Sequence, residues 1–344
     1  MGFKNNKIII IGSFTSPIYS SAFFQALNDN DYTVNKIDTS FLEKNFFSKL
    51  GIVFPTIFNP LIFVKNIFFI YKLIKFVKYD LFFFWSPIDI HPFNFYILKF
   101  LKKKIYIYNN DNPYIKKSFK DIRNYFKWRW FYKSLSYSSL TLCYRPKDLI
   151  NSKEFGSKSV KLSMPYFIPS RDYPHPYQLK KKYDVTFVGH FENDIRFEYL
   201  KYAAEKGLKV KIYGNNIHNP WITKGYRHKN LSISGLIDIQ KYRKTVSLSL
   251  VMACFLSKKN KDVYTRRTFE IPAMKGILLS ERTQEQKKIY IENKEALYFS
   301  SKEEFVKKIF WVKENPLRAK SIVDNAYTKT INFHSIYHRI NDLF

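Results

Sequence analysis

Short apolar runs alternate with helical patterns in two stretches of the chain. One stretch precedes and the other follows a segment rich in proline and charged residues. Strands that alternate with helices pack into a parallel sheet covered by helices. The sequence therefore predicts an α/β protein with two facing Rossmann-like domains and a ligand cleft between them. The expected strands cover residues 7–11, 31–38, 80–85, 104–108, 141–144, 184–188, 209–213, 231–234 and 247–252.

The segment 166–182, FIPSRDYPHPYQLKKKY, has the composition of an interdomain linker. A length of 344 residues is also typical of two domains. We expect an acceptor-binding domain over 1–165 and a nucleotide-binding domain over 183–331. A last helix is expected over 332–344.

The segment from Asp262 to Ser280 places two carboxylates on either side of two adjacent arginines. A helix that begins near Thr265 and stops at Gly276 would present free N–H groups, an anion site, at its first turn. Pro272 is expected to kink or shorten this helix.

The chemistry of this turn fits a nucleotide diphosphate. Arg266 and Arg267 are candidates to clamp phosphate oxygens, and Thr268 lies in the same turn. Glu270 is a candidate to accept hydrogen bonds from the hydroxyls of a ribose. The alternative is that Arg266 and Glu270 form only an exposed pair four residues apart on a helix.

The order of residues in this segment resembles the sugar-nucleotide site of group-1 glycosyltransferases of the GT-B superfamily. The Arg-Thr-Phe-Glu run and the Gly-Ile-Leu-Leu-Ser run at 276–280 are most similar to the subgroup with spore-maturation-type domains. The similarity covers residues 184–344 well and the N-terminal half loosely.

The resemblance implies that Glu270 binds the ribose and that Asp262, in place of the usual Glu, lies near the donor sugar. It also implies a donor held by residues 184–300, an acceptor held by residues 1–165, and retention of anomeric configuration. The last helix is expected to cross back onto the first domain, as in that superfamily.

Five other candidates follow expected strands, where open sheets place ligands. Gly12 follows the first strand, and the loop there either faces a ligand or is a generic turn between strand and helix. A single glycine does not make a GxGxxG fingerprint. Gly189, His190 and Arg196 occupy the equivalent turn of the second domain, where Arg196 is a candidate phosphate ligand and His190 a catalytic candidate or a plain loop histidine. Asp111 either orients an acceptor hydroxyl or caps a turn.

No carboxylate or histidine cluster has the spacing of a metal site. The Asp-Asn-Asp run at 29–31 is explained by turn chemistry. We therefore expect no metal and no cofactor besides the nucleotide-diphosphate sugar, with Arg266, Arg267 and Arg196 neutralising the leaving group. Two widely separated cysteines indicate a reducing, cytoplasmic compartment.

The formal net charge of +30 points to an anionic partner, and no nucleic-acid-binding motif is present. Residues 61–78 resemble a basic amphipathic helix, with Lys65, Lys72, Lys75 and Lys78 along one stripe. Such a helix binds an anionic membrane surface peripherally. The alternative is an ordinary helix packed on the sheet with its lysines in water.

Together these patterns predict a glycosyltransferase that moves a sugar from a nucleotide diphosphate to a hydroxyl of a cell-envelope glycan or lipid-linked saccharide. Two alternatives stay open. The first is transfer of another activated group, such as a polyol phosphate, and the second is a non-catalytic basic protein that docks on membrane or nucleic acid.

Overall fold

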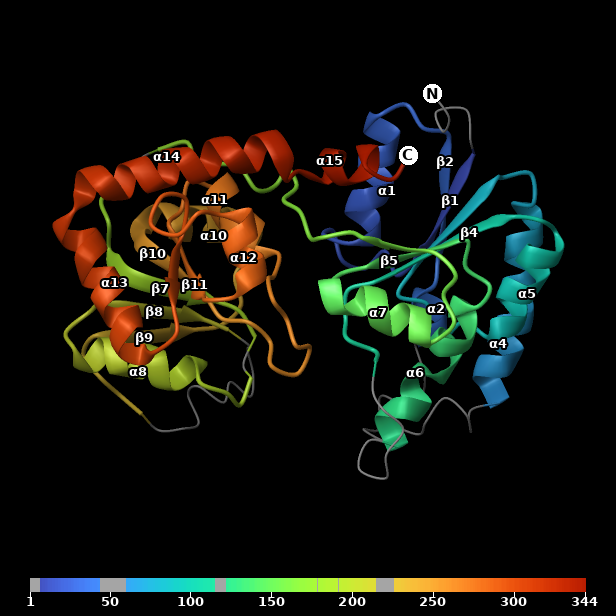
Figure 1. Cartoon of the computed structure of the whole chain (residues 1–344), viewed down its shortest axis with the longest axis horizontal. Helices are drawn as coiled ribbons and strands as arrows, with labels where there is room; N and C mark the ends of the chain where they lie inside the picture. The colour runs from blue at the N-terminus through green and yellow to red at the C-terminus, as the bar shows by residue number, and fades with distance from the viewer. Residues whose placement is uncertain (1–6, 44–59, 115–121, 178, 191, 215–225) are drawn as a thin grey trace. The chain divides into compact units, whose positions relative to one another are not determined.

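The computed structural model describes residues 7–43, 60–114, 122–177, 179–190, 192–214 and 226–344 (Figure 1). The chain forms two compact units. The first contains Met1–Met164 together with Arg339–Phe344, and the second contains Pro165–His338. Each unit is an α/β structure, which confirms the predicted fold class.

The first unit is built on a parallel sheet of six strands in the order β2-β1-β3-β4-β5-β6. The runs IIIIG and LFFFW of β1 and β3 are buried along their whole length, as expected of central strands covered on both faces. The strands are β1 (Ile8–Gly12), β2 (Val34–Asp38), β3 (Leu81–Trp85), β4 (Lys104–Asn109), β5 (Leu140–Cys143) and β6 (Val160–Leu162).

Helices cover both faces of this sheet (Figure 1). Apolar side chains of the sheet and of four helices form one buried cluster that includes Phe69, Phe95 and Phe131. The helices are α1 (Ser20–Asp29), α2 (Ser40–Glu43), α4 (Pro60–Lys75), α5 (Pro92–Phe100), α6 (Ile122–Leu135) and α7 (Pro146–Glu154).

The second unit is also built on a parallel sheet of six strands, in the order β12-β11-β10-β7-β8-β9. The chain runs outward from β7 to β9, then returns to lay β10 beside β7. This reversal is the switch point at which open α/β sheets bind ligands, outside the carboxyl ends of the strands. The strands are β7 (Tyr183–Val188), β8 (Val210–Tyr213), β9 (Leu231–Ser234), β10 (Ser249–Cys254), β11 (Leu278–Glu281) and β12 (Leu297–Phe299).

The helices of the second unit pack on this sheet and close a second apolar core, in which Phe187, Phe255 and Phe305 are buried. They are α8 (Arg196–Glu205), α10 (Ile239–Leu248), α11 (Arg267–Ala273), α12 (Gln284–Ile289), α13 (Lys302–Glu314) and α14 (Pro316–Phe333).

The C-terminal residues belong to the first unit. The last helix, α15 (Ile336–Asn341), begins four residues after the predicted start at Asn332, which lies inside α14. Arg339 Nε donates to the carbonyl of Met164 at 3.2 Å. The ring of Phe344 lies 5.6 Å from that of Tyr32 and 6.2 Å from that of Tyr106, so it packs among aromatic side chains of the first unit.

The segment expected to be a linker, 166–182, is part of the second unit instead. Asp172 is 1% exposed and its Oδ2 accepts a hydrogen bond from the backbone N–H of Ile168 at 2.8 Å. Phe167 pairs with Ser335 in a parallel bridge. Proline and charge in this segment therefore mark a folded connection.

Within the described residues, no helix combines the length and apolar character needed to cross a bilayer.

Candidate functional site

Helix α11 is shorter than predicted and has seven residues, from Arg267 to Ala273. Pro272 lies inside it, and the helix ends one residue later, in agreement with the expected shortening. Thr265 does bind the first turn, because its Oγ1 accepts from the N–H of Arg267 at 3.2 Å. Thr268 is fully buried and its hydroxyl donates to Gln286, so it holds the helix in the core.

Glu270 and Arg266 form an ion pair, as one of the alternatives predicted, but this pair is buried. Nε and Nη2 of Arg266 lie 2.9 and 2.7 Å from Glu270 Oε1, and the two side chains are only 12% and 7% exposed. The exposed form of the pair was therefore a wrong expectation, since the segment around Asp172 covers it.

Two further residues complete this cluster, which we call the Glu270 network. Arg171 Nη1 donates to Glu270 Oε1 at 3.0 Å and also contacts the Asp172 carboxylate. Arg266 Nη2 lies 3.5 Å from Asp172 Oδ2. Sequence reasoning missed Arg171 and Asp172 because they lie in the segment predicted to be a linker. An adjacent Arg-Asp pair between prolines was the only local signal.

The network keeps Glu270 ionised. Burial alone would raise the pKa of this carboxyl group, but the guanidinium groups of Arg266, Arg171 and Arg267 outweigh burial and lower it. In contrast, burial and the charge of Glu270 raise the pKa of Asp172 to about 6, against the opposing effect of Arg266 and Arg171. The arginines therefore lower the pKa of Glu270 enough to outweigh its burial, but they do not do so for Asp172.

Tyr242 of α10 presents a buried hydroxyl near the same charges. Among the described residues, this hydroxyl has no hydrogen-bond partner. Burial raises the pKa of Tyr242, and Glu270 raises it further, so the phenol stays neutral. A buried polar group without a partner in a native structure needs an explanation, and a ligand is one. Sequence reasoning missed Tyr242, because nothing local distinguishes it from a core tyrosine.

Arg267 lies at the switch point of the second sheet. Gly189 directly follows β7, and a Cβ placed on it would lie 2.6 Å from Phe187 Cζ and 3.1 Å from Arg267 Nη2. The Arg267 guanidinium therefore lies against the backbone at the carboxyl end of β7. It forms no ion pair within the described parts of the chain, whereas its neighbour Arg266 is fully engaged with Glu270 and Asp172.

The turn after Gly189 is held by Arg196. This side chain is buried, and its Nε and Nη2 bind the Asp194 carboxylate at 2.8 and 2.7 Å. Its Nη1 donates to the carbonyl of His190 at 2.8 Å. Arg196, expected as a phosphate ligand, thus uses its guanidinium inside the protein. His190 is exposed next to Gly189, and Asp262 is half-buried in the turn before α11.

In the first unit, the predicted residues follow strands as expected. A Cβ on Gly12, at the end of β1, would lie 2.9 Å from Trp85 Cβ, so an aromatic side chain covers this position. Asp111 lies beyond β4, and its carbonyl accepts from Asn109 Nδ2 at 3.1 Å, as in a turn. Across the described residues, no three His, Cys, Asp or Glu side chains gather in a way that would hold a metal ion.

Proteins of known structure share this fold. Sucrose-phosphate synthase from Thermosynechococcus elongatus superposes with a TM-score of 0.70 at 12% identity, over 98% of both chains. A glycosyltransferase from Rickettsia africae gives 0.69 at 14% identity, over 98% of this chain and 97% of the other. HepE from Anabaena, in complex with UDP-glucose, gives 0.65 at 11% identity, over 98% of both chains.

No curated protein sequence matches the chain. Residues 196–344 match the family described as glycosyl transferase-like, which supports transferase activity. This match includes α11 with Arg267 and Glu270 but not residues 1–195, which contain all six strands of the first unit. The chain therefore has the fold of GT-B glycosyltransferases and carries, in residues 196–344, a domain of the glycosyl transferase-like family.

Proposed function

We propose that the chain transfers a sugar from a nucleotide-diphosphate sugar to a hydroxyl acceptor. The observation that carries this proposal is the position of Arg267 against Gly189, at the carboxyl end of β7 and without a carboxylate partner among the described residues. A guanidinium binds phosphate oxygens through paired hydrogen bonds. It would stabilise the charge that develops on the departing diphosphate.

Glu270 and Tyr242 would bind the nucleoside. The described hydrogen bonds of the Glu270 carboxylate all end on Oε1, so Oε2 is the atom proposed to accept from ribose hydroxyls. The Arg266 and Arg171 contacts would hold this carboxylate ionised and in one rotamer. Asp262 and His190 are proposed to contact the donor sugar, and Asp111 the acceptor hydroxyl. Uridine is the proposed base, because HepE, with the same fold, was crystallised with UDP and UDP-glucose.

Titration calorimetry with UDP, GDP and CDP, followed by hydrolysis assays with their sugars, tests the proposal. We expect one diphosphate to bind, with Glu270→Gln weakening it. Gln at 270 keeps a hydrogen-bonding carbonyl but removes a charge, and a hydrogen bond to a charged group contributes about 1.5–3 kcal/mol. Absence of binding for all three nucleotides by the folded wild-type protein would refute the donor site.

Two other functions are outcomes of the same assays. Turnover of CDP-activated polyols, with no turnover of nucleotide sugars, would show transfer of a polyol phosphate. Binding of a nucleotide without any turnover would show a non-catalytic docking protein. Retention of anomeric configuration is proposed on the resemblance stated for α11 and would be read from the NMR coupling of the product's anomeric proton.

We also propose that transfer proceeds without a metal, because the Arg267 guanidinium would bind the diphosphate and offset its charge. Activity should then persist in EDTA. Loss of activity on chelation, restored by manganese or magnesium, would contradict this and return attention to residues 29–31.

Peripheral binding to an anionic membrane is proposed for α4, with a lipid-linked saccharide of the cell envelope as acceptor. The outer face of this helix is apolar: six of its side chains are between 46% and 65% exposed, namely Phe63, Val64, Ile67, Phe68, Tyr71 and Ile74. The lysine stripe is not uniformly in water. Lys65 Nζ donates to the carbonyl of Phe41, and Lys72 Nζ lies 4.0 Å from the Phe41 ring centroid.

The neighbouring helix α5 extends this apolar face. Phe93, Tyr96 and Phe100 are 51%, 51% and 75% exposed. Exposed apolar area of this extent marks an interaction site. Lys75 and Lys78, which are exposed at the end of α4, would contact lipid headgroups while the rings enter the interface.

Co-sedimentation with liposomes that contain phosphatidylglycerol tests this surface. Phe63→Ser with Phe68→Ser should abolish binding, whereas Leu317→Ser with Ile291→Ser in the second unit, which removes side chains that are 84% and 50% exposed, should not. Binding should fall as salt rises, since headgroup attraction is screened. Equal binding by both double variants would exclude α4 as the docking surface.

A further inference from the structure

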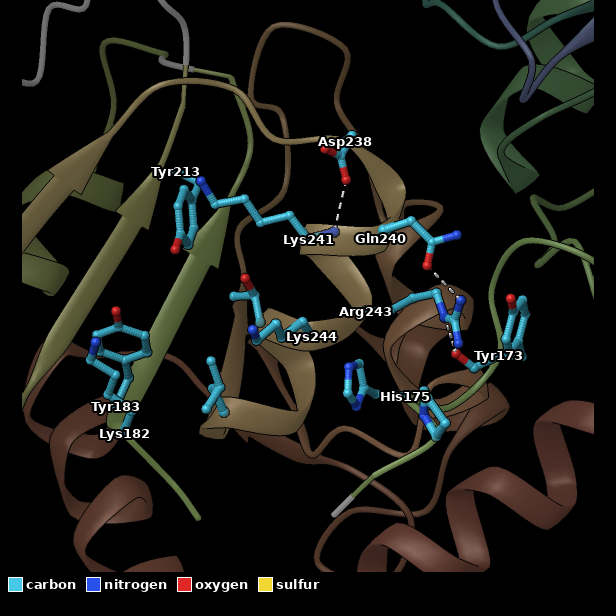
Figure 2. A pocket seen from close by; sticks show the side chains of 13 residues that line it. Tyr173, His175, Lys182, Tyr183, Tyr213, Asp238, Gln240, Lys241, Arg243 and Lys244 are labelled. Atoms are coloured by element: carbon cyan, nitrogen blue, oxygen red, sulfur yellow. Dashed lines mark hydrogen bonds between the residues drawn. The ribbon is translucent and has the colours of Figure 1, made fainter. Parts of the chain in front are cut away.

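A cavity of about 870 Å³ opens on the second unit, away from the residues assigned to the donor. Its walls are the segment 173–176, the starting end of β7, the end of β8 and one face of α10 (Figure 2). None of Gly189, Arg267 or Glu270 lines it. Tyr242, which also belongs to α10, does not line it either. The volume lies in the range typical of small-molecule sites, about 300–1,000 Å³.

The charged side chains that line the cavity are mostly cations. Lys182, Lys241 and Lys244 are exposed in it, and none forms an ion pair with any residue that the structure describes. The one lining carboxylate, Asp238, caps α10 by accepting from the N–H of Lys241 at 2.8 Å. The lining therefore attracts an anion.

One wall of the cavity is built around a buried arginine. Arg243 is 3% exposed, and its guanidinium donates to the carbonyls of Tyr173 and Pro174 at 2.9 and 3.0 Å. Its carbon Cζ lies 3.2 Å from the ring centroid of Tyr173, and Nη1 donates to Gln240 at 3.0 Å. These contacts fix the Tyr173 ring on α10, so the wall exists before a ligand arrives.

A buried lysine contacts one of the tyrosine rings that line the cavity. Lys211 is 7% exposed, and its Nζ lies 2.7 and 2.6 Å from the hydroxyls of Ser232 and Ser234. It also lies 4.7 Å from the centroid of the Tyr213 ring, which lines the cavity. Lysine is rarely buried without a carboxylate, and among the described residues Lys211 has these two hydroxyls and the Tyr213 ring as its partners. Burial lowers the pKa of Lys211, and the charges of Lys241 and Lys182 lower it further.

Aromatic rings lie beside the ammonium groups. Lys241 Nζ is 5.6 Å from the Tyr213 centroid, and Lys182 Nζ is 5.6 Å from the Tyr183 centroid. Tyrosine rings offer flat apolar surface with a polar edge, which suits the apolar face of a sugar ring. Figure 2 shows Tyr213 and Tyr183 on one side of the cavity and Lys241 and Lys244 on α10 across from them.

We propose that this cavity binds a saccharide that carries phosphate or carboxylate groups, at a site separate from the nucleotide. The lysines would neutralise the anionic groups, and the tyrosine rings would pack on the sugar. A volume of about 870 Å³ is large enough for one to a few sugar rings. The inference rests on the cavity itself and stands whether or not the donor site is confirmed.

Titration calorimetry on the full chain, with saturating UDP present, tests the proposal. The probes are tri-galacturonate, trehalose 6-phosphate, uncharged maltotriose, inorganic phosphate and polyuridylate. We expect tri-galacturonate or trehalose 6-phosphate to bind at least tenfold more tightly than maltotriose and inorganic phosphate. The tighter of these two probes identifies the anionic group.

Lys241→Gln with Lys244→Gln should weaken that binding at least tenfold. The matched control, Arg318→Gln with Lys320→Gln, removes the same charge from exposed positions of α14 and should have no effect. UDP affinity should be unchanged in both. If the Lys241→Gln, Lys244→Gln variant unfolds at a lower temperature than wild type, Lys182→Gln on another wall of the cavity should be used in its place. It should also weaken binding of the anionic saccharide.

If both double variants weaken binding of the anionic saccharide equally, the effect comes from the net charge of the protein and the proposal is overturned. Equal affinity for maltotriose, or for inorganic phosphate alone, would also overturn it. Tighter binding of polyuridylate that depends on Lys241 and Lys244 would replace the saccharide by a nucleic acid.

Discussion

The two sheets place a glycine at the same point, directly at the end of their first strand, and surround it differently. Gly12 lies against Trp85, a side chain from the neighbouring strand β3. Gly189 lies against Arg267, a side chain from the beginning of α11. The fold therefore determines where a ligand can approach the strand end, because both sheets have a glycine there. The side chain that lies there decides whether an anion is attracted.

The strand ends of the first unit are filled by rings. Trp85 lies 4.6 Å from Tyr108 and 5.7 Å from Phe23 between ring centroids. In the second unit, the equivalent neighbourhood contains Arg267 and the charged Glu270 network. Phosphate chemistry is therefore proposed for one strand end only, although β1 and β7 both lie where the strand order of their sheet reverses.

The largest expected effect separates Arg267 from Arg266. Arg267→Ala should lower turnover by about 10²–10³ with little change in melting temperature, since it removes a donor aimed at developing charge. Arg266→Ala should instead lower the free energy of unfolding by about 3–5 kcal/mol, because Glu270 and Asp172 lose a buried partner. Steady-state kinetics and urea unfolding measure the two.

A matched loss of stability in both variants would show that Arg267 is structural. Full activity of folded Arg267→Ala would remove it from the site.

A smaller effect is expected from adding one methyl group at each glycine. Gly189→Ala and Gly12→Ala should each cost about 1–3 kcal/mol of stability, because the new Cβ meets Phe187 or Trp85 below 3.0 Å. Only Gly189→Ala should also weaken UDP binding, since it pushes Arg267 aside. Calorimetry of both variants at one temperature compares them. Equal losses of UDP affinity would mean that the two strand ends are not functionally different.

The smallest effect concerns the titration of Asp172. Its pKa is raised to about 6 from the ordinary value of 3.8 for an aspartate, so between these values the native state binds a proton that the unfolded state has lost. This group therefore stabilises the fold at low pH, and its contribution falls as pH rises to about 6. His91 acts in the opposite direction, because burial and two nearby cations lower its pKa.

Comparison with Asp172→Asn isolates the carboxyl group from His91. The advantage of wild type over the variant in free energy of unfolding should decrease between pH 4 and pH 6 and then level off. A difference that is constant over this range would contradict a raised pKa for Asp172.

The strands were largely predictable from sequence, because buried parallel strands are continuous apolar runs such as the isoleucines of β1. The chemistry around α11 was only partly predictable. Arg171 and Glu270 are 99 positions apart, and no local pattern joins them. Likewise, Arg196 satisfies the phosphate pattern in sequence but binds Asp194 in the structure. Local periodicity reports burial, whereas charge partners come from tertiary contacts.

The assignment of Arg339–Phe344 to the first unit has a consequence for the order of synthesis. The second unit is inserted into the first, between Met164 and Arg339. The ribosome therefore synthesises the whole second unit before Phe344, whose aromatic ring packs beside Tyr32 and Tyr106. The first unit begins earlier but is completed last, so a nascent chain exposes that unfilled aromatic surface for most of its translation.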